Sequence, residues 1–70
     1  MNKVVVEGIL TYEDGTWVTI TVDNLDIQGI LKEFTPLHIG TFVRAEGYLV
    51  ATHMDANKFV ITKIEQINKA

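Results

Sequence analysis

The chain has 70 residues, no cysteine, six Lys or Arg, nine Asp or Glu and a net charge of -3. This length predicts one small domain over residues 1–70, and the absence of cysteine excludes disulfides, thiolate zinc sites and cysteine nucleophiles. A hydrophobic fraction of 47% with 21% charged residues is typical of a folded globular domain and excludes a disordered tail. The acidic balance is unfavourable for a protein that mainly neutralises phosphates.

The hydropathy pattern predicts no membrane segment. The longest apolar stretches, Val4–Val6 and Tyr48–Ala51, are far shorter than the roughly 20 residues that a membrane-spanning helix needs. The N-terminus also lacks the apolar region of a secretory signal. We therefore expect a cytoplasmic protein without a membrane partner.

The first two predicted strands follow from residues that alternate between apolar and polar. Over Lys3–Tyr12 the inward side carries Val4, Val6 and Leu10. Gly8 interrupts this side, which predicts a bulge or a sharp bend. Residues 13–16, Glu-Asp-Gly-Thr, predict a tight turn. In the second strand, Trp17–Val22, the apolar positions 18, 20 and 22 point inward and Trp17, Thr19 and Thr21 point outward.

A third strand and a long connection come next. After a turn at residues 23–24, Leu25–Lys32 places Leu25, Ile27 and Leu31 on one side, with Gly29 between them as a kink. Residues 33–41 contain the single proline and no helical repeat, which predicts a loop with at most one helical turn. Three apolar residues of this loop are expected to cap the end of the core: Phe34, Leu37 and Ile39.

The fourth and fifth predicted strands are joined by a polar turn at residues 53–57. Phe42–Thr52 has small residues inward, and its inward side consists of Val43, Ala45, Gly47, Leu49 and Ala51. Its outward side consists of Phe42, Arg44, Glu46, Tyr48 and Val50. In Lys58–Ile67 the apolar positions change parity midway, which indicates either a bulge or a strand that leaves one sheet and joins another.

Five short strands with kinking glycines favour a small barrel, which has no open sheet edges. The segments Val4–Leu10, His38–Leu49 and Phe59–Ile67 resemble the first, fourth and closing strands of the OB-fold. The resemblance implies an all-β, five-stranded Greek-key barrel. The sequence departs from many OB-folds in lacking a full helix between the third and fourth strands. An SH3-like or Sm-like barrel is the alternative fold.

The OB-fold resemblance implies binding of single-stranded nucleic acid, DNA or RNA, on an outer sheet face. Such folds stack bases on aromatic side chains beside a basic groove, near the loops after the first and fourth strands. Stacking is expected on Trp17 and Tyr48, with backbone charge met by Lys32, Arg44 and Lys58. Trp17 either lies on this face or covers the core as a lid. The expected site comprises Trp17, Thr19, Ile30, Lys32, Arg44, Tyr48, His53 and Lys58.

The sequence gives no pattern typical of an enzyme. His38 and His53 are not at metal-ligand spacing, and the acidic pair at residues 13–14 suits a turn. We therefore expect a non-enzymatic module without metal or cofactor. One alternative is a protein-interaction or self-assembly module that uses the same aromatic face or an open strand edge, with a homo-oligomer as one form. Another is an inhibitor that mimics the phosphate backbone for a nucleic-acid enzyme.

Overall fold

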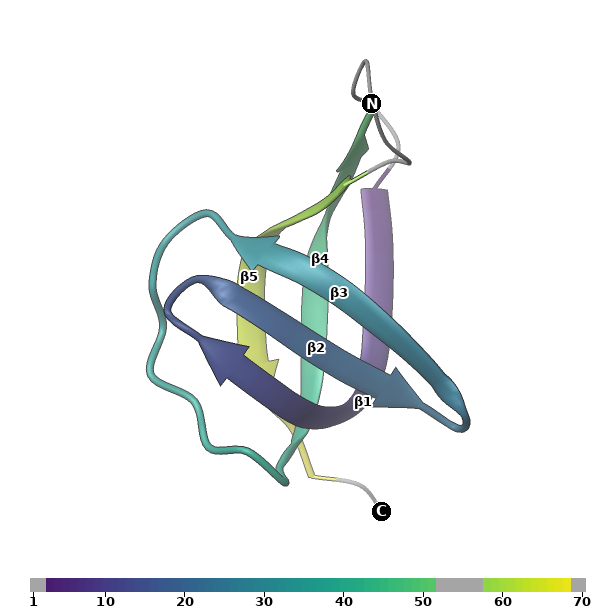
Figure 1. Cartoon of the computed structure of the whole chain (residues 1–70), viewed down its shortest axis with the longest axis vertical. Helices are drawn as coiled ribbons and strands as arrows, with labels where there is room; N and C mark the ends of the chain where they lie inside the picture. The colour runs from purple at the N-terminus through teal and green to yellow at the C-terminus, as the bar shows by residue number, and fades with distance from the viewer. Residues whose placement is uncertain (1–2, 52–57, 69–70) are drawn as a thin grey trace.

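The computed structural model describes residues 3–51 and 58–68, which form five strands closed into one barrel. Around the barrel the strands follow the order β1-β2-β3-β5-β4. All neighbours are antiparallel except β3 and β5, which run parallel. In Figure 1, β2, β3 and the second half of β1 cross in front of β4 and β5. The strands are β1 (Lys3–Asp14), β2 (Trp17–Val22), β3 (Leu25–Leu31), β4 (Phe42–Val50) and β5 (Lys58–Gln66). The predicted all-β, five-stranded barrel is confirmed.

The core lies inside the barrel and consists of the side chains that alternation places inward. Its fully buried members include Leu10, Ile20 and Ile61. Burial of each such side chain contributes about 1.5–3 kcal/mol to stability. The whole core comprises Val6, Leu10, Val18, Ile20, Leu31, Val43, Ala45, Phe59 and Ile61. The two-residue period of the sequence therefore predicts most of the packing.

The barrel closes because β1 is shared between two neighbours. It pairs with β4 over Lys3–Ile9 and with β2 over Ile9–Asp14. Gly8 lies at the changeover, where an added Cβ would sit 2.5 Å from the carbonyl oxygen of Thr21. A side chain at this position would hold β2 away from β1. Gly8 therefore lies where β2 approaches the backbone of β1 closely, and the bulge of β1 comes later, between Leu10 and Tyr12.

The parity change in β5 is a bulge. Lys63 is opposite Glu46 while Ile61 is opposite Gly47, so Thr62 is the extra residue. The Thr62 hydroxyl donates a hydrogen bond of 3.2 Å to the carbonyl oxygen of Glu46. Gly47 is required here, because a Cβ would overlap the backbone of Val60. The bulge shifts the inward and outward alternation by one residue in the second half of β5, which is a common effect of a bulge.

Five apolar residues that were predicted to be inward or capping are exposed instead: Leu25, Leu49, Ala51, Phe34 and Ile39. Leu25 is 64% exposed at the start of β3, and Leu49 is exposed near the end of β4. Both lie at strand ends beyond the last core residues. In the connection at residues 32–41, which contains no helix, Leu37 packs against the core while Phe34 and Ile39 are exposed. Capping by all three loop residues was therefore a wrong prediction, because the connection runs along the outside and lays one side chain inward.

Candidate functional site

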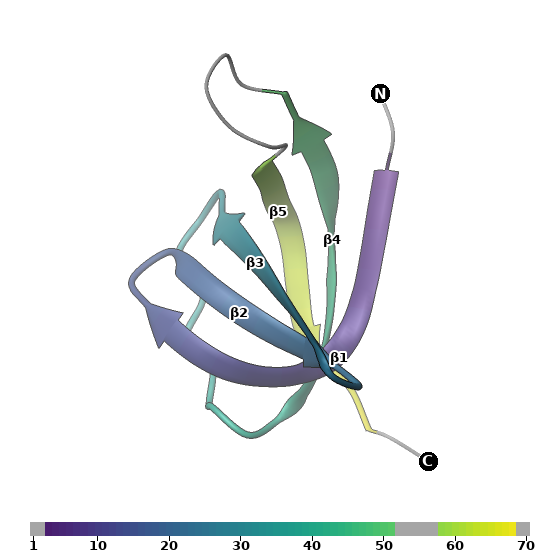
Figure 2. The ribbon, with the colours of Figure 1, turned by 45° about the vertical axis from the view of Figure 1, so that its right-hand side comes forward.

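An apolar row crosses four neighbouring strands on the outside of the barrel. Trp17 on β2 is opposite Ile30 on β3, Ile30 is opposite Val60 on β5, and Val60 is opposite Tyr48 on β4. Directly opposed residues project to the same side of a sheet. We call these four residues the apolar row. At about 4.8 Å between strands, its two aromatic ends are separated by about 14 Å. Figure 2 shows β2, β3, β5 and β4 side by side.

The row is accessible at both ends. Trp17 is 39% exposed and is not part of the core, so its position is that of a surface residue rather than a lid. Ile30, Val60 and Tyr48 are half-buried. A shallow hollow beside Trp17 is lined by Gln28, Gly29, Ile30, Lys58 and Phe59. A second hollow, beside Tyr48, is lined by Lys3, Glu46, Gly47, Thr62 and Lys63.

Four lysines flank the apolar row. Lys58 lines the hollow beside Trp17, and Lys3 is directly opposite Tyr48. Lys63 lines the hollow beside Tyr48, and Lys32 follows β3 two residues after Ile30. The backbone of Lys32 is fixed, because its N–H donates to the carbonyl oxygen of Ile61 at 2.9 Å. The net charge of the chain therefore understates how many cations this face carries.

Acidic side chains also lie beside the row, and one of them is paired. The Lys3 ammonium is 2.9 Å from the Glu46 carboxylate. The hydrogen bond from Lys3 holds the pKa of Glu46 below its usual range, against the opposing effect of partial desolvation. Asp14 is opposite Trp17 at the other end of the row. Glu46 therefore accounts for part of the charge of Lys3, while Lys32, Lys58 and Lys63 remain as the other cations of this face.

Arg44 belongs to a different row. Its Nε donates to a Glu7 carboxylate oxygen at 2.6 Å, and its second carboxylate neighbour, Glu65, is at 4.0 Å. The Glu7 hydrogen bond raises the pKa of Arg44, and its charge adds to the effect. These three residues are opposite one another on β1, β4 and β5, and we call them the charged row. Arg44 lies four residues from Tyr48 along β4, about 13 Å away. The structure does not bring Arg44 to Trp17.

Thr19 shares the outward face with Trp17 but is only 8% exposed. It is opposite Tyr12 on β1 and Gln28 on β3. The predicted exposure of Thr19 was therefore wrong, and both of its direct partners carry longer side chains than its own. His53, another expected site residue, lies outside the described residues.

Sequence reasoning missed four residues of this face: Tyr12, Val60, Lys3 and Lys63. Tyr12 is exposed and is a diagonal neighbour of Trp17, since its direct partner is Thr19. Such diagonal pairs are about 7–8 Å apart, within reach of aromatic side chains. A bulge between Leu10 and Tyr12 changes the parity there, as the bulge at Thr62 does for Lys63. Of these four residues, only Val60 could have been identified from the sequence. It lies between two inward residues, so strand alternation places it outward.

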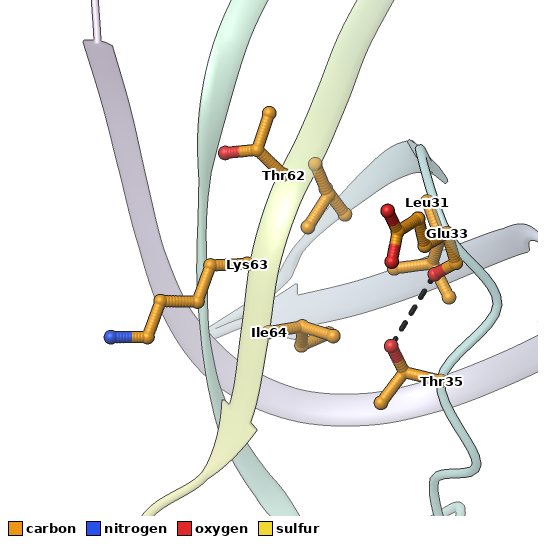
Figure 3. Close-up of a pocket in the computed structure, with 7 residues that line it drawn as sticks. Leu31, Glu33, Thr35, Thr62, Lys63 and Ile64 are labelled. Atoms are coloured by element: carbon orange, nitrogen blue, oxygen red, sulfur yellow. Dashed lines mark hydrogen bonds between the residues drawn. The ribbon is translucent and has the colours of Figure 1, made fainter.

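The small pocket in Figure 3 lies between β5 and the connection that follows β3. The Thr35 hydroxyl there donates to the carbonyl oxygen of Glu33 at 3.3 Å, and the Thr62 hydroxyl donates to that of Glu46. The side chain of Lys63 points away from this pocket. Both hydroxyls thus bind backbone carbonyl oxygens.

Within residues 3–51 and 58–68, no three His, Asp or Glu side chains are grouped as metal ligands. The same residues include no helix that is long and apolar enough to cross a membrane.

Comparison of the chain with protein-family models, curated proteins and solved structures gave no match. What the fold and the surface define is a small closed β-barrel with an aromatic-ended apolar row on its outer face.

Proposed function

We propose that this protein is an OB-fold module that binds single-stranded nucleic acid across the apolar row. The strand order β1-β2-β3-β5-β4 supports the OB-fold assignment, because that fold is a five-stranded Greek-key barrel. OB-folds bind oligonucleotides on the face of their second and third strands and at the loops after the first and fourth. Trp17 follows the first of these loops, and Lys58 follows the second.

The single observation that carries the proposal is the continuous register from Trp17 to Tyr48. In this mechanism one base stacks on the Trp17 indole and another on the Tyr48 ring, with Ile30 and Val60 as an apolar floor between them. Stacking contributes about 1–3 kcal/mol per base and tolerates any sequence, because every base has a π-face. The flanking lysines meet the phosphates.

The small number of lysines predicts a weak dependence of nucleic-acid affinity on salt concentration. With about three or four phosphate contacts, the logarithm of affinity falls with the logarithm of salt concentration with a slope of about -2 to -3, at about 0.7 per phosphate for single strands. This slope is shallow for a nucleic-acid-binding protein. It agrees with a chain whose overall charge is acidic.

Fluorescence of Trp17, the single tryptophan, tests the proposal directly. We expect saturable quenching by oligo(dT) or oligo(rU) that weakens as salt rises. Tyr48→Ala should lower the affinity about 5- to 150-fold, by loss of one stacking platform. Phe34→Ala is the matched control, because Phe34 is an aromatic that is 60% exposed and lies on the connection, away from the row.

Two results contradict the proposal. The first is a Trp17 spectrum that does not respond to either oligonucleotide at low salt. The second is an equal loss of affinity in Tyr48→Ala and Phe34→Ala, since binding would then not depend on the apolar row. Either result favours a protein partner for this face.

A further inference from the structure

The first half of β1 is an open strand edge. Over Lys3–Glu7 it pairs with β4 on one side, and pairing with β2 begins only at Ile9. In Figure 2 this half of β1 stands at the side of the barrel, and no other strand of the described residues lies beyond it. In an antiparallel pair, alternate residues direct their N–H and C=O groups away from the partner. These groups are available to a further strand.

This edge lacks two of the features that prevent strand addition, proline and a bulge. Natural edges are protected by proline, bulges, short length or charged side chains, lysine in particular. Lys3–Glu7 contains no proline, its register with β4 is continuous, and it includes three consecutive valines. Val5 is 51% exposed in the middle of the segment. Lys3 and Glu7 are the charged residues of this edge, one at each end.

We propose that a second copy of this chain pairs with this edge, β1 against β1, antiparallel and centred on Val5. In this register Lys3 is opposite Glu7 of the second copy, and Glu7 is opposite its Lys3. Val4 is opposite Val6 in the same way. The segment is thus complementary to itself, as a two-fold interface requires. Opposite charges that face each other across strands are stabilising.

Other registers lose this complementarity. Pairing centred on Lys3 or on Glu7 places like charges opposite each other, and pairing centred on Val4 or Val6 leaves the charged residues opposite valine or unpaired. A parallel in-register arrangement also places like charges side by side. The charge pattern therefore selects one geometry out of those the edge allows.

The dimer extends the surface described above. It joins two three-stranded sheets into one that runs β5-β4-β1 and then β1-β4-β5 of the second copy. The charged row Glu65, Arg44 and Glu7 continues into Lys3 of the second copy, so the signs alternate. Beyond that lysine lies the second copy's apolar row. This pairing does not rest on nucleic-acid binding, although two rows on one sheet would lengthen a binding track.

A pair of charge variants tests the register in the full-length chain. Lys3→Glu and Glu7→Lys each place like charges opposite each other in their own dimer. We expect each to raise the dimer dissociation constant about tenfold or more in sedimentation velocity, whereas an equimolar mixture of the two restores dimers. Far-UV circular dichroism and thermal unfolding confirm that each variant is folded.

A crosslinking measurement does not depend on the charges. Because the chain has no cysteine, Val5→Cys introduces a single thiol that faces its own copy across the two-fold axis. Directly opposed Cα atoms are about 4.5–5.5 Å apart, which a disulfide can bridge. We expect a disulfide-linked dimer on mild oxidation, and much slower linkage for Val50→Cys, an exposed valine at the end of β4.

Three results would overturn the proposal. One is a wild-type chain that stays monomeric at the highest soluble concentration. Another is a dimer that neither charge variant weakens, and the third is equal crosslinking of Val5→Cys and Val50→Cys. Binding of oligonucleotide by a monomer would leave the proposed function standing while this pairing fails.

Discussion

The apolar row and the charged row have the same architecture but opposite chemistry. Each is a line of directly opposed residues on the outside of the barrel, and both include β4 and β5. In the apolar row, Trp17 is substantially exposed and is adjacent to lysines. In the charged row, Arg44 lies between two carboxylates.

The difference teaches that residue type alone does not identify a candidate binding surface. A charged side chain must also be available to a ligand, rather than already paired with carboxylates. Arg44 and Lys58 are equivalent cations in a composition count. Glu7 and Glu65 already neutralise the guanidinium of Arg44, so a phosphate would have to displace them. Lys58 lies beside an exposed aromatic ring, which is the arrangement that single-strand binding requires.

Among the variants that probe the two rows, the largest effect is expected from Gly47→Ala, because both rows depend on the β4–β5 register. A Cβ at this position overlaps the backbone of Val60 next to the bulge. We expect a loss of about 3 kcal/mol in the free energy of unfolding, measured by urea denaturation. Gly15→Ala is the control, since its Cβ meets nothing within 4 Å and its cost comes from a φ of +62°. That cost is about 1 kcal/mol. Equal losses in the two variants would contradict the packing argument.

A smaller loss of stability is expected from Trp17→Ala. Trp17 packs on the outside, so its removal should cost about 1 kcal/mol, the upper range for a cross-strand pair. Ile20→Ala, inside the barrel, should cost about 2–5 kcal/mol. Chemical denaturation of both variants measures the difference. If Trp17→Ala unfolds the domain, the residue is a core lid and the apolar row is not a free surface.

Removal of one cation from each row separates their roles in binding. Lys58→Gln and Arg44→Gln change the net charge equally. Lys58→Gln should reduce the slope of affinity against salt by about 0.7, the value for one phosphate contact to a single strand. Arg44→Gln should leave the slope nearly unchanged. Oligonucleotide titrations at several salt concentrations measure both slopes, and a larger change for Arg44→Gln would reverse the assignment.

The smallest effect concerns pH and Glu46. Because Lys3 lowers the pKa of Glu46 in the folded state, this carboxylate stabilises the fold above its ordinary pKa of 4.5. That contribution is lost as the pH falls below this value and through the lowered pKa. Urea midpoints should therefore fall slightly less on acidification for Glu46→Gln than for the wild type. This difference between the variant and the wild type should shrink at high salt, because salt screens the exposed ion pair of Lys3 and Glu46. An unchanged difference at all pH values would show that Lys3 does not stabilise the carboxylate.

The sequence predicted the strands because period-two alternation is a local property. Val18 and Ile20 are inward wherever the strand is placed, and a turn at Gly15 needs only its neighbours. Predictions failed where the pairing between strands is irregular and where a strand ends. Tyr12 was missed because a bulge precedes it, and Leu25 was placed inside because alternation does not show where the barrel stops covering a strand.

The candidate site was predicted only in part, because strand alternation is a local property. Trp17 and Tyr48 were recognised as outward aromatics from their own strands, but nothing in the sequence placed them in one row. Their connection runs through Ile30 and Val60, and it depends on the parallel pairing of β3 with β5. Val60 was overlooked because its importance comes entirely from what lies on either side of it.

By itself, the sequence determined the fold class, the strand positions and most of the core. These features depend on neighbours along the chain and on the burial of apolar side chains. Only the tertiary structure decided which outward residues meet. The partner of Arg44, Glu7, is 37 residues away along the chain. The bulges at β1 and β5 set such pairings, and so does the way β1 divides its pairing between β4 and β2. A shift of one residue would bring different side chains together.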